Sequence, residues 1–133
     1  AGRRDLSENF MIGYITLGTN DLDRATAFYD ALFEGQGVKR LQPNDRIRLW
    51  ARQGAPMFGI AVPWDGNPAT VGNGTMIALG VDDVDVVRTI YDRAMSLGGK
   101  DEGQPGPRGT GGFYGGYFRD PDGNKLVVFC RVS

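Results

Sequence analysis

An internal repeat constrains the fold of this chain more than any other feature of its sequence. Residues 15–32 read ITLGTNDLDRATAFYDAL, and residues 77–94 read IALGVDDVDVVRTIYDRA. Both segments pair an alternating apolar strand with a polar turn and a helical pattern. At the constant offset of 62 that separates residue 15 from residue 77, the identical pairs are Ile15/Ile77, Leu17/Leu79, Gly18/Gly80, Asp21/Asp83, Asp23/Asp85, Tyr29/Tyr91 and Asp30/Asp92. Matches in one register favour duplication, so both halves are expected to fold alike.

The helical part of each copy has one apolar face and clear ends. Apolar residues recur at i, i+3, i+4 and i+7, which places them on one side of a helix. In the two halves these residues are Ala25, Phe28, Tyr29 and Leu32, and then Val87, Ile90, Tyr91 and Ala94. The aspartates of each copy suit the N-terminal end as cap and first-turn residues. Gly35 or Gly37 is expected to stop the first helix, and Gly98 the second.

Three strand-like segments follow each helix. In the first half they cover about 38–41, 47–52 and 57–62, and in the second about 99–102, 112–119 and 125–131. The Pro and Gly of D120-P-D-G-N124 predict a turn between the last two strands. Loops are expected at 63–74, which joins the halves, and at 103–112. The chain is therefore predicted to be α+β, with tandem βαβββ modules at about 11–63 and 75–132 that form one domain at 11–133.

Residue types that are rare or missing exclude several chemistries. The sequence has 133 residues, a formal net charge of −1, one cysteine and no histidine. Without histidine the chain lacks the commonest general base and transition-metal ligand, and neither a Ser-His-Asp triad nor a Cys-His pair can form. The charge balance gives no reason to expect nucleic acid or an anionic membrane as a partner. The single Cys130 fits a cytoplasmic location, and it is expected to pack as a small apolar residue.

The first residues stand apart from the repeat. The segment AGRRDLSENF lacks the apolar run of a signal peptide, and no run in the chain approaches the ~20 apolar residues that span a bilayer. Residues 1–10 are interpreted as either a tag before Met11 or a native polar arm.

The repeat and its motifs together resemble a known superfamily. Two βαβββ units, an NDL or DDV turn after the first strand, an FYD helix and a closing DPDGN hairpin are similar to the vicinal oxygen chelate superfamily. Its members include glyoxalase I, extradiol dioxygenases, fosfomycin-resistance enzymes and bleomycin-resistance proteins. The phrases GTNDLDRATAFYDAL, PATVGNGTM and GGFYGGYFRDPDGNKL resemble its small glyoxalase/bleomycin-resistance branch. The resemblance implies a partly closed mixed β-barrel with helices outside, and a homodimer whose half-barrels pair within one chain or across two.

The resemblance also implies where metal ligands would lie in metal-dependent relatives. By that comparison the ligand positions of the two halves fall on Tyr14, Met76 and Val127, with the fourth near Gly59. These side chains offer neither carboxylate nor imidazole, which divalent cations require. Metal-dependent glyoxalase or dioxygenase chemistry is therefore not expected, and no cofactor is predicted.

Aromatic, sulfur-containing and arginine side chains supply the remaining candidates for a site. In the strand I47-R-L-W-A-R52, Arg48 and Trp50 share one face, and Phe113, Gly115 and Tyr117 share a face of a later strand. A pocket with such a lining suits an anionic or aromatic small molecule. An equally good interpretation of any one residue is a solvated arginine or a core aromatic. The predicted ligand-binding residues are Tyr14, Arg48, Trp50, Met57, Met76 and Tyr117.

Three functions remain compatible with the sequence. The first is a cytoplasmic, dimeric, metal-free protein that sequesters or senses a small molecule. The second is a metal-independent isomerase or lyase that uses Tyr14 or Tyr117 as an acid or base, so the enzyme question stays open. The third is an interaction protein whose cavity is filled by its own side chains. No residue can be assigned a catalytic role from the sequence.

Overall fold

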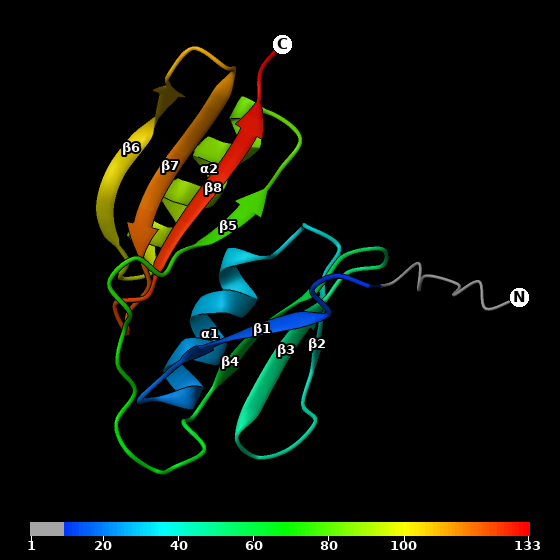
Figure 1. The fold of residues 1–133 in the computed structure, drawn as a ribbon, viewed down its shortest axis with the longest axis vertical. Helices are drawn as coiled ribbons and strands as arrows, with labels where there is room; N and C mark the ends of the chain where they lie inside the picture. The colour runs from blue at the N-terminus through cyan, green and yellow to red at the C-terminus, as the bar shows by residue number, and fades with distance from the viewer. Residues whose placement is uncertain (1–9) are drawn as a thin grey trace, which may run out of the picture.

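The computed structural model describes residues 10–133 as two modules of the same design (Figure 1). The prediction for residues 1–10 falls almost wholly outside this range. Module 1 contains β1 (Tyr14–Gly18), α1 (Leu22–Leu32), β2 (Lys39–Leu41), β3 (Ile47–Ala51) and β4 (Met57–Ala61). Module 2 contains β5 (Ile77–Gly80), α2 (Val84–Ser96), β6 (Lys100–Arg108), β7 (Phe113–Arg119) and β8 (Lys125–Arg131).

Each module builds one four-stranded sheet with the same strand order. The orders are β1-β4-β3-β2 and β5-β8-β7-β6. In both sheets the first strand pairs in parallel with the last, and the other pairings are antiparallel. The predicted α+β fold of tandem βαβββ modules is confirmed. Among residues 10–133 each sheet is paired only within its own module, so the ladders do not close one barrel within the chain.

The helix ends follow the capping chemistry of the repeated aspartates. The carboxylate of Asp21 accepts a hydrogen bond from the backbone N–H of Arg24, and that of Asp83 accepts one from Val86, both at 3.0 Å. Gly98 follows the last residues of α2 with a φ of 96°, a conformation that glycine adopts without steric cost. Neither helix of the described chain is long and apolar enough to cross a membrane.

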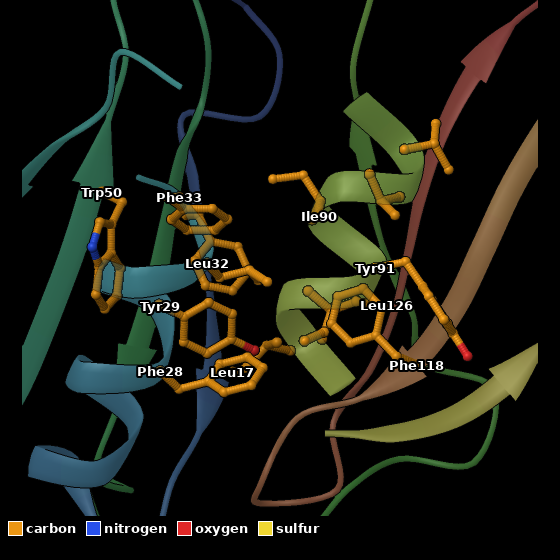
Figure 2. Packing of buried hydrophobic residues seen from close by; sticks show 14 of the residues in the cluster. Leu17, Phe28, Tyr29, Leu32, Phe33, Trp50, Ile90, Tyr91, Phe118 and Leu126 are labelled. Atoms are coloured by element: carbon orange, nitrogen blue, oxygen red, sulfur yellow. The ribbon is translucent and has the colours of Figure 1, made fainter. Parts of the chain in front are cut away.

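One apolar core joins the two modules. The helices pack against each other, and each also packs on the sheet of its own module (Figure 2). On the module 1 side the core is largely aromatic, whereas α2 contributes aliphatic residues such as Ile90. The aromatic cluster consists of Phe28, Tyr29, Phe33, Trp50 and Phe58.

Strand β6 corrects the prediction for the Gly/Pro-rich segment. The sequence indicated a short strand near 99–102 and a loop at 103–112, but β6 runs to Arg108. It is an edge strand, where proline costs no ladder bond if its nitrogen faces away from the neighbour. Register shifts between Asp101 and Gly103, and between Gly103 and Gly106, absorb the irregular residues. The predicted loop is thus reduced to the turn before Phe113.

The D120-P-D-G-N124 turn lies between β7 and β8, as predicted, but it also holds the modules together. The buried carboxylate of Asp120 accepts hydrogen bonds from the Tyr29 hydroxyl at 2.6 Å and from the Asn124 amide at 3.0 Å. Asn124 also donates to the carbonyl of Gly18 at 2.9 Å. The hydroxyl of Thr19 donates to the Asp122 carboxylate at 2.6 Å. These bonds fix the end of β1 and the middle of α1 to the hairpin of module 2.

Burial of this turn changes the acidity of its groups. Desolvation raises the pKa of Asp120, although the hydrogen bonds from Tyr29 and Asn124 oppose the rise. Burial, the negative charge of Asp120 and the hydrogen bond to it raise the pKa of Tyr29 well above its ordinary value. Because Tyr29 lies inside the core, its hydrogen bond to Asp120 is part of the contact between the two modules.

Candidate ligand-binding faces

Each sheet turns one face toward its helix and presents a second face on the opposite side. Residues of one strand alternate between these faces, and Ile15, Leu17, Phe58 and Ile60 point into the core. Their neighbours define the open face of module 1, which consists of Tyr14, Thr16, Leu49, Met57 and Gly59. In the same way, the open face of module 2 consists of Ala78, Gly80, Phe113, Gly115, Tyr117, Val127 and Phe129.

The strand register identifies equivalent positions on the two open faces. Thr16 and Ala78 are related by the repeat, and their parallel partners are Gly59 and Val127. Gly59 and Val127 are therefore structurally equivalent. This agrees with the register inferred from the resemblance, in which both positions would carry ligands in a metal-dependent relative.

The residues at those positions do not fit a metal. A Cβ atom on Gly59 would lie 2.7 Å from the carbonyl oxygen of Ile15, so the position has no room for a side chain. Val127 is 1% exposed and apolar, and Met76 offers only a thioether. Tyr14, which is 59% exposed, supplies one phenol. Within residues 10–133 no three His, Cys, Asp or Glu side chains are grouped closely enough to hold a metal ion.

The open face of module 2 instead carries aromatic rings beside cations. The rings of Phe113 and Phe129 are stacked, with centroids 5.1 Å apart and planes 8° from parallel. The guanidinium of Arg108 lies 5.4 Å from the centre of the Tyr117 ring, and the ammonium of Lys125 lies 5.7 Å from it. Such rings and cations can hold a planar ligand that bears negative charge.

The six predicted site residues fall into three groups. Tyr14 and Met57 are direct partners in the β1–β4 ladder and share the open face of module 1. The second group, Tyr117 and Met76, belongs to module 2. Tyr117 lies on the open face of that module, and Met76 immediately precedes β5.

The third group, Arg48 and Trp50, points to the helix side of its sheet. The indole of Trp50 is 3% exposed and donates to the Asp30 carboxylate at 3.0 Å. The guanidinium of Arg48 donates to the carbonyls of Asn44 and Ile47, both at 2.9 Å.

Sequence reasoning missed the groups around Tyr117. Phe129 is in phase with Val127 on β8, so strict alternation places it on the same face. Lys125 precedes Val127 by two residues, so the same alternation places its side chain on this face. Arg108 gave no such signal, because it follows the irregular Gly/Pro segment that sequence reasoning interpreted as a loop.

A cavity of about 520 Å³ lies between the two modules. Its lining includes three of the predicted residues, Trp50, Met57 and Met76, and it also includes Arg52. Tyr14, Arg48 and Tyr117 are not part of this lining as the structure describes it. The predicted residues therefore do not converge on one pocket within the chain.

The paired βαβββ modules, with open faces opposite the helices, define a protein of the vicinal oxygen chelate type. The chain belongs to the Glyoxalase/Bleomycin resistance protein/Dioxygenase superfamily, whose family model matches residues 11–128. This membership confirms the resemblance inferred from the repeat and the DPDGN hairpin.

Solved structures agree with the family assignment. A glyoxalase/bleomycin resistance protein from Albidiferax ferrireducens T118 is 33% identical, with a TM-score of 0.83, and the match covers 91% of this chain and 98% of that one. A lactoylglutathione lyase from Agrobacterium tumefaciens is 24% identical, with a TM-score of 0.68 over 93% of this chain and 96% of that one. A family enzyme from Burkholderia phytofirmans PsJN is 16% identical, with a TM-score of 0.72 over 90% and 98%. The last two show the fold alone. No curated protein sequence is significantly similar to the chain.

Proposed function

We propose that this chain binds a small molecule without a metal and acts by sequestration or sensing. The ligand is an anionic aromatic compound that lies on the open face of module 2. One observation carries this proposal: Arg108 and Lys125 both lie beside the Tyr117 ring, on the face that also bears the stacked Phe113–Phe129 pair. The non-coordinating residues at the four metal positions support the metal-free part.

We further propose that a second copy of the chain completes the site. Tyr14 on the open face of module 1 is 59% exposed, and Met76, which directly precedes β5, is 42% exposed. Covering such groups with the open face of another copy would remove apolar area from water. The half-barrels would then pair across chains, with the helices outside. Sedimentation should give twice the 14.5 kDa mass of one chain. The buried free thiol of Cys130 is compatible with the cytoplasmic location included in this proposal.

A titration with 2-naphthoate tests the ligand site. The probe combines a planar ring system with one carboxylate, and binding is measured by calorimetry before and after treatment with EDTA. We expect saturable binding that EDTA does not change. Lys125→Gln should weaken it about threefold, because an exposed cation–π or ionic contact contributes about 0.5–1 kcal/mol. Lys39→Gln, which makes the same charge change on β2 of module 1, is the matched control.

Three results would overturn the proposal. They are a stoichiometric metal in elemental analysis, a loss of binding with EDTA, and equal effects of the two lysine variants. Mass spectrometry of candidate ligands after incubation separates binding from catalysis. If a ligand is converted, and Tyr117→Phe stops the conversion while affinity persists, a metal-independent isomerase or lyase replaces the sequestering protein.

A further inference from the structure

The cavity between the modules has the size and depth of a small-molecule site. Its volume of about 520 Å³ lies within the usual range for ligand pockets. Phe33 and Phe58 of module 1 line it, as do Ile90 and Val128 of module 2. These four side chains are at most 9% exposed, so the deepest part of the cavity is bounded by the protein core. An apolar group that enters the cavity would replace water against this surface.

One side chain gives the cavity a charge preference. Among the described lining residues, Arg52 is the only charged one, and Gln36 is the only other polar side chain. Arg52 is exposed and forms no ion pair within residues 10–133. An arginine at the border of an apolar cavity, without an acidic residue in the same lining, favours a ligand that brings its own carboxylate.

The cavity overlaps the open face of module 2 at β5, where both include Ala78 and Gly80. Neither Tyr117 nor the stacked Phe113–Phe129 pair belongs to its described lining. The ligand chemistry of the two places differs as well, because the cavity is mainly aliphatic and carries a single guanidinium.

We propose that the cavity is a second binding site, which takes an amphipathic carboxylate with a medium-length aliphatic chain. The aliphatic chain of the ligand lies against Phe33, Ile90 and Val128, and the carboxylate of the ligand reaches Arg52. This site does not depend on the proposed function of the open face.

Fluorescence of Trp50 provides a local measurement of binding. The sequence has two tryptophans, and Trp64 is 86% exposed, so Trp64→Phe leaves Trp50 in the cavity wall as the single indole. This protein is titrated with octanoate, octan-1-ol and octylammonium, which share one chain and differ in charge. We expect saturable binding in the order octanoate, octan-1-ol, octylammonium. Arg52→Gln should weaken octanoate threefold to tenfold and leave octan-1-ol unchanged.

Two further variants locate the effect. Lys39→Gln removes the same charge from an exposed position on β2, outside the described lining, and should leave all three affinities unchanged. Val38→Phe adds volume to the lining and should weaken octanoate and octan-1-ol together. Melting curves confirm that each variant is folded, and Arg52→Gln alters an exposed side chain, so it tests the proposal even if Val38→Phe does not fold.

Several outcomes would overturn the second site. Octanoate and octylammonium binding equally, or an unchanged octanoate affinity in Arg52→Gln, would show that Arg52 does not select the ligand. Absence of saturable binding would show that the cavity does not accept the chain. If the Trp50 signal instead changes with protein concentration and octanoate has no effect, a second copy of the protein occupies the cavity.

Discussion

The two modules share a topology but use their aromatic residues differently. Module 1 places most of its rings on the helix side, where Phe28, Tyr29 and Trp50 fill the core. Module 2 fills its helix side mainly with aliphatic residues and places Phe113 and Phe129 on its open face. Because a strand alternates between its faces, a repeat can keep its pairing and still exchange the chemistry of those faces. The duplicated scaffold thus has one module that anchors the core and another suited to bind a ligand.

The repeated tyrosines show the same divergence at a single position. Tyr29 and Tyr91 occupy equivalent sites on α1 and α2, and each donates to a carboxylate at 2.6 Å. Tyr29 reaches Asp120 in the other module, whereas Tyr91 reaches Asp101 within its own module. Asp120 is 3% exposed and Asp101 is exposed to solvent. The hydrogen bond of Tyr29 therefore joins the two modules, whereas the hydrogen bond of Tyr91 lies within module 2 and reaches its edge strand β6.

Replacing these two carboxylates should give the largest difference between the modules. Asp120→Ala removes the acceptor for Tyr29, for the side chain and backbone N–H of Asn124, and for the backbone N–H of Asp122. A buried group left without a partner costs about 1–3 kcal/mol, so a total of at least about 3 kcal/mol is expected. Asp101→Ala should cost a small fraction of that, because water can replace the lost acceptor. Urea unfolding of both variants measures the difference.

A similar loss in both variants would contradict this comparison. It would mean that the Asp120 turn does not hold the modules together more strongly than an exposed contact does. The slope of the unfolding curve provides a control, since it should stay the same if both variants unfold in one step.

The open faces should also differ in their tolerance of added volume. At Gly59 a new Cβ would lie 2.7 Å from a backbone oxygen of β1, whereas at Gly115 it would lie 2.7 Å from the ring of Phe113. The ring is partly exposed and can turn aside, but the β1 backbone is fixed by its ladder with β4. Gly59→Ala should therefore cost about 1–3 kcal/mol, and Gly115→Ala less. Thermal unfolding measures both, and a larger loss for Gly115→Ala would contradict the proposed difference in rigidity.

Local and periodic features of this fold could be predicted from the sequence, but contacts between distant residues could not. The offset of 62, the aspartate caps and the DPDGN turn depend on neighbours along the chain, and each prediction was confirmed. The bond from Tyr29 to Asp120 joins residues 91 positions apart, and no pattern signals it. Alternation placed Arg48 and Trp50 on one face, but it could not say that this face meets the helix. The length of strand β6 was underestimated because proline and glycine resemble a loop unless the strand is known to lie at an edge.

The last comparison of the two modules concerns stability at high pH. Burial raises the pKa of Tyr91 to about 12, and that of Tyr29 well above the ordinary value of 10.0. The folded state therefore keeps these protons at pH values where the unfolded chain loses them. Stability should fall as pH rises above about 10, by at most about 1.4 kcal/mol per pH unit for each tyrosine. For Tyr91 the fall should end near pH 12.

Tyr29→Phe and Tyr91→Phe separate the two contributions. Each variant removes one ionisable group, so each should flatten the decline of unfolding free energy between pH 10 and 12. Comparing slopes avoids the constant loss that Tyr29→Phe suffers at every pH, because Asp120 then lacks a donor. If either variant keeps the slope of the unsubstituted protein between pH 10 and 12, the tyrosine that it lacks does not hold its proton more tightly in the folded chain than in the unfolded one. Burial and the hydrogen bond to the carboxylate would then not raise the pKa of that tyrosine.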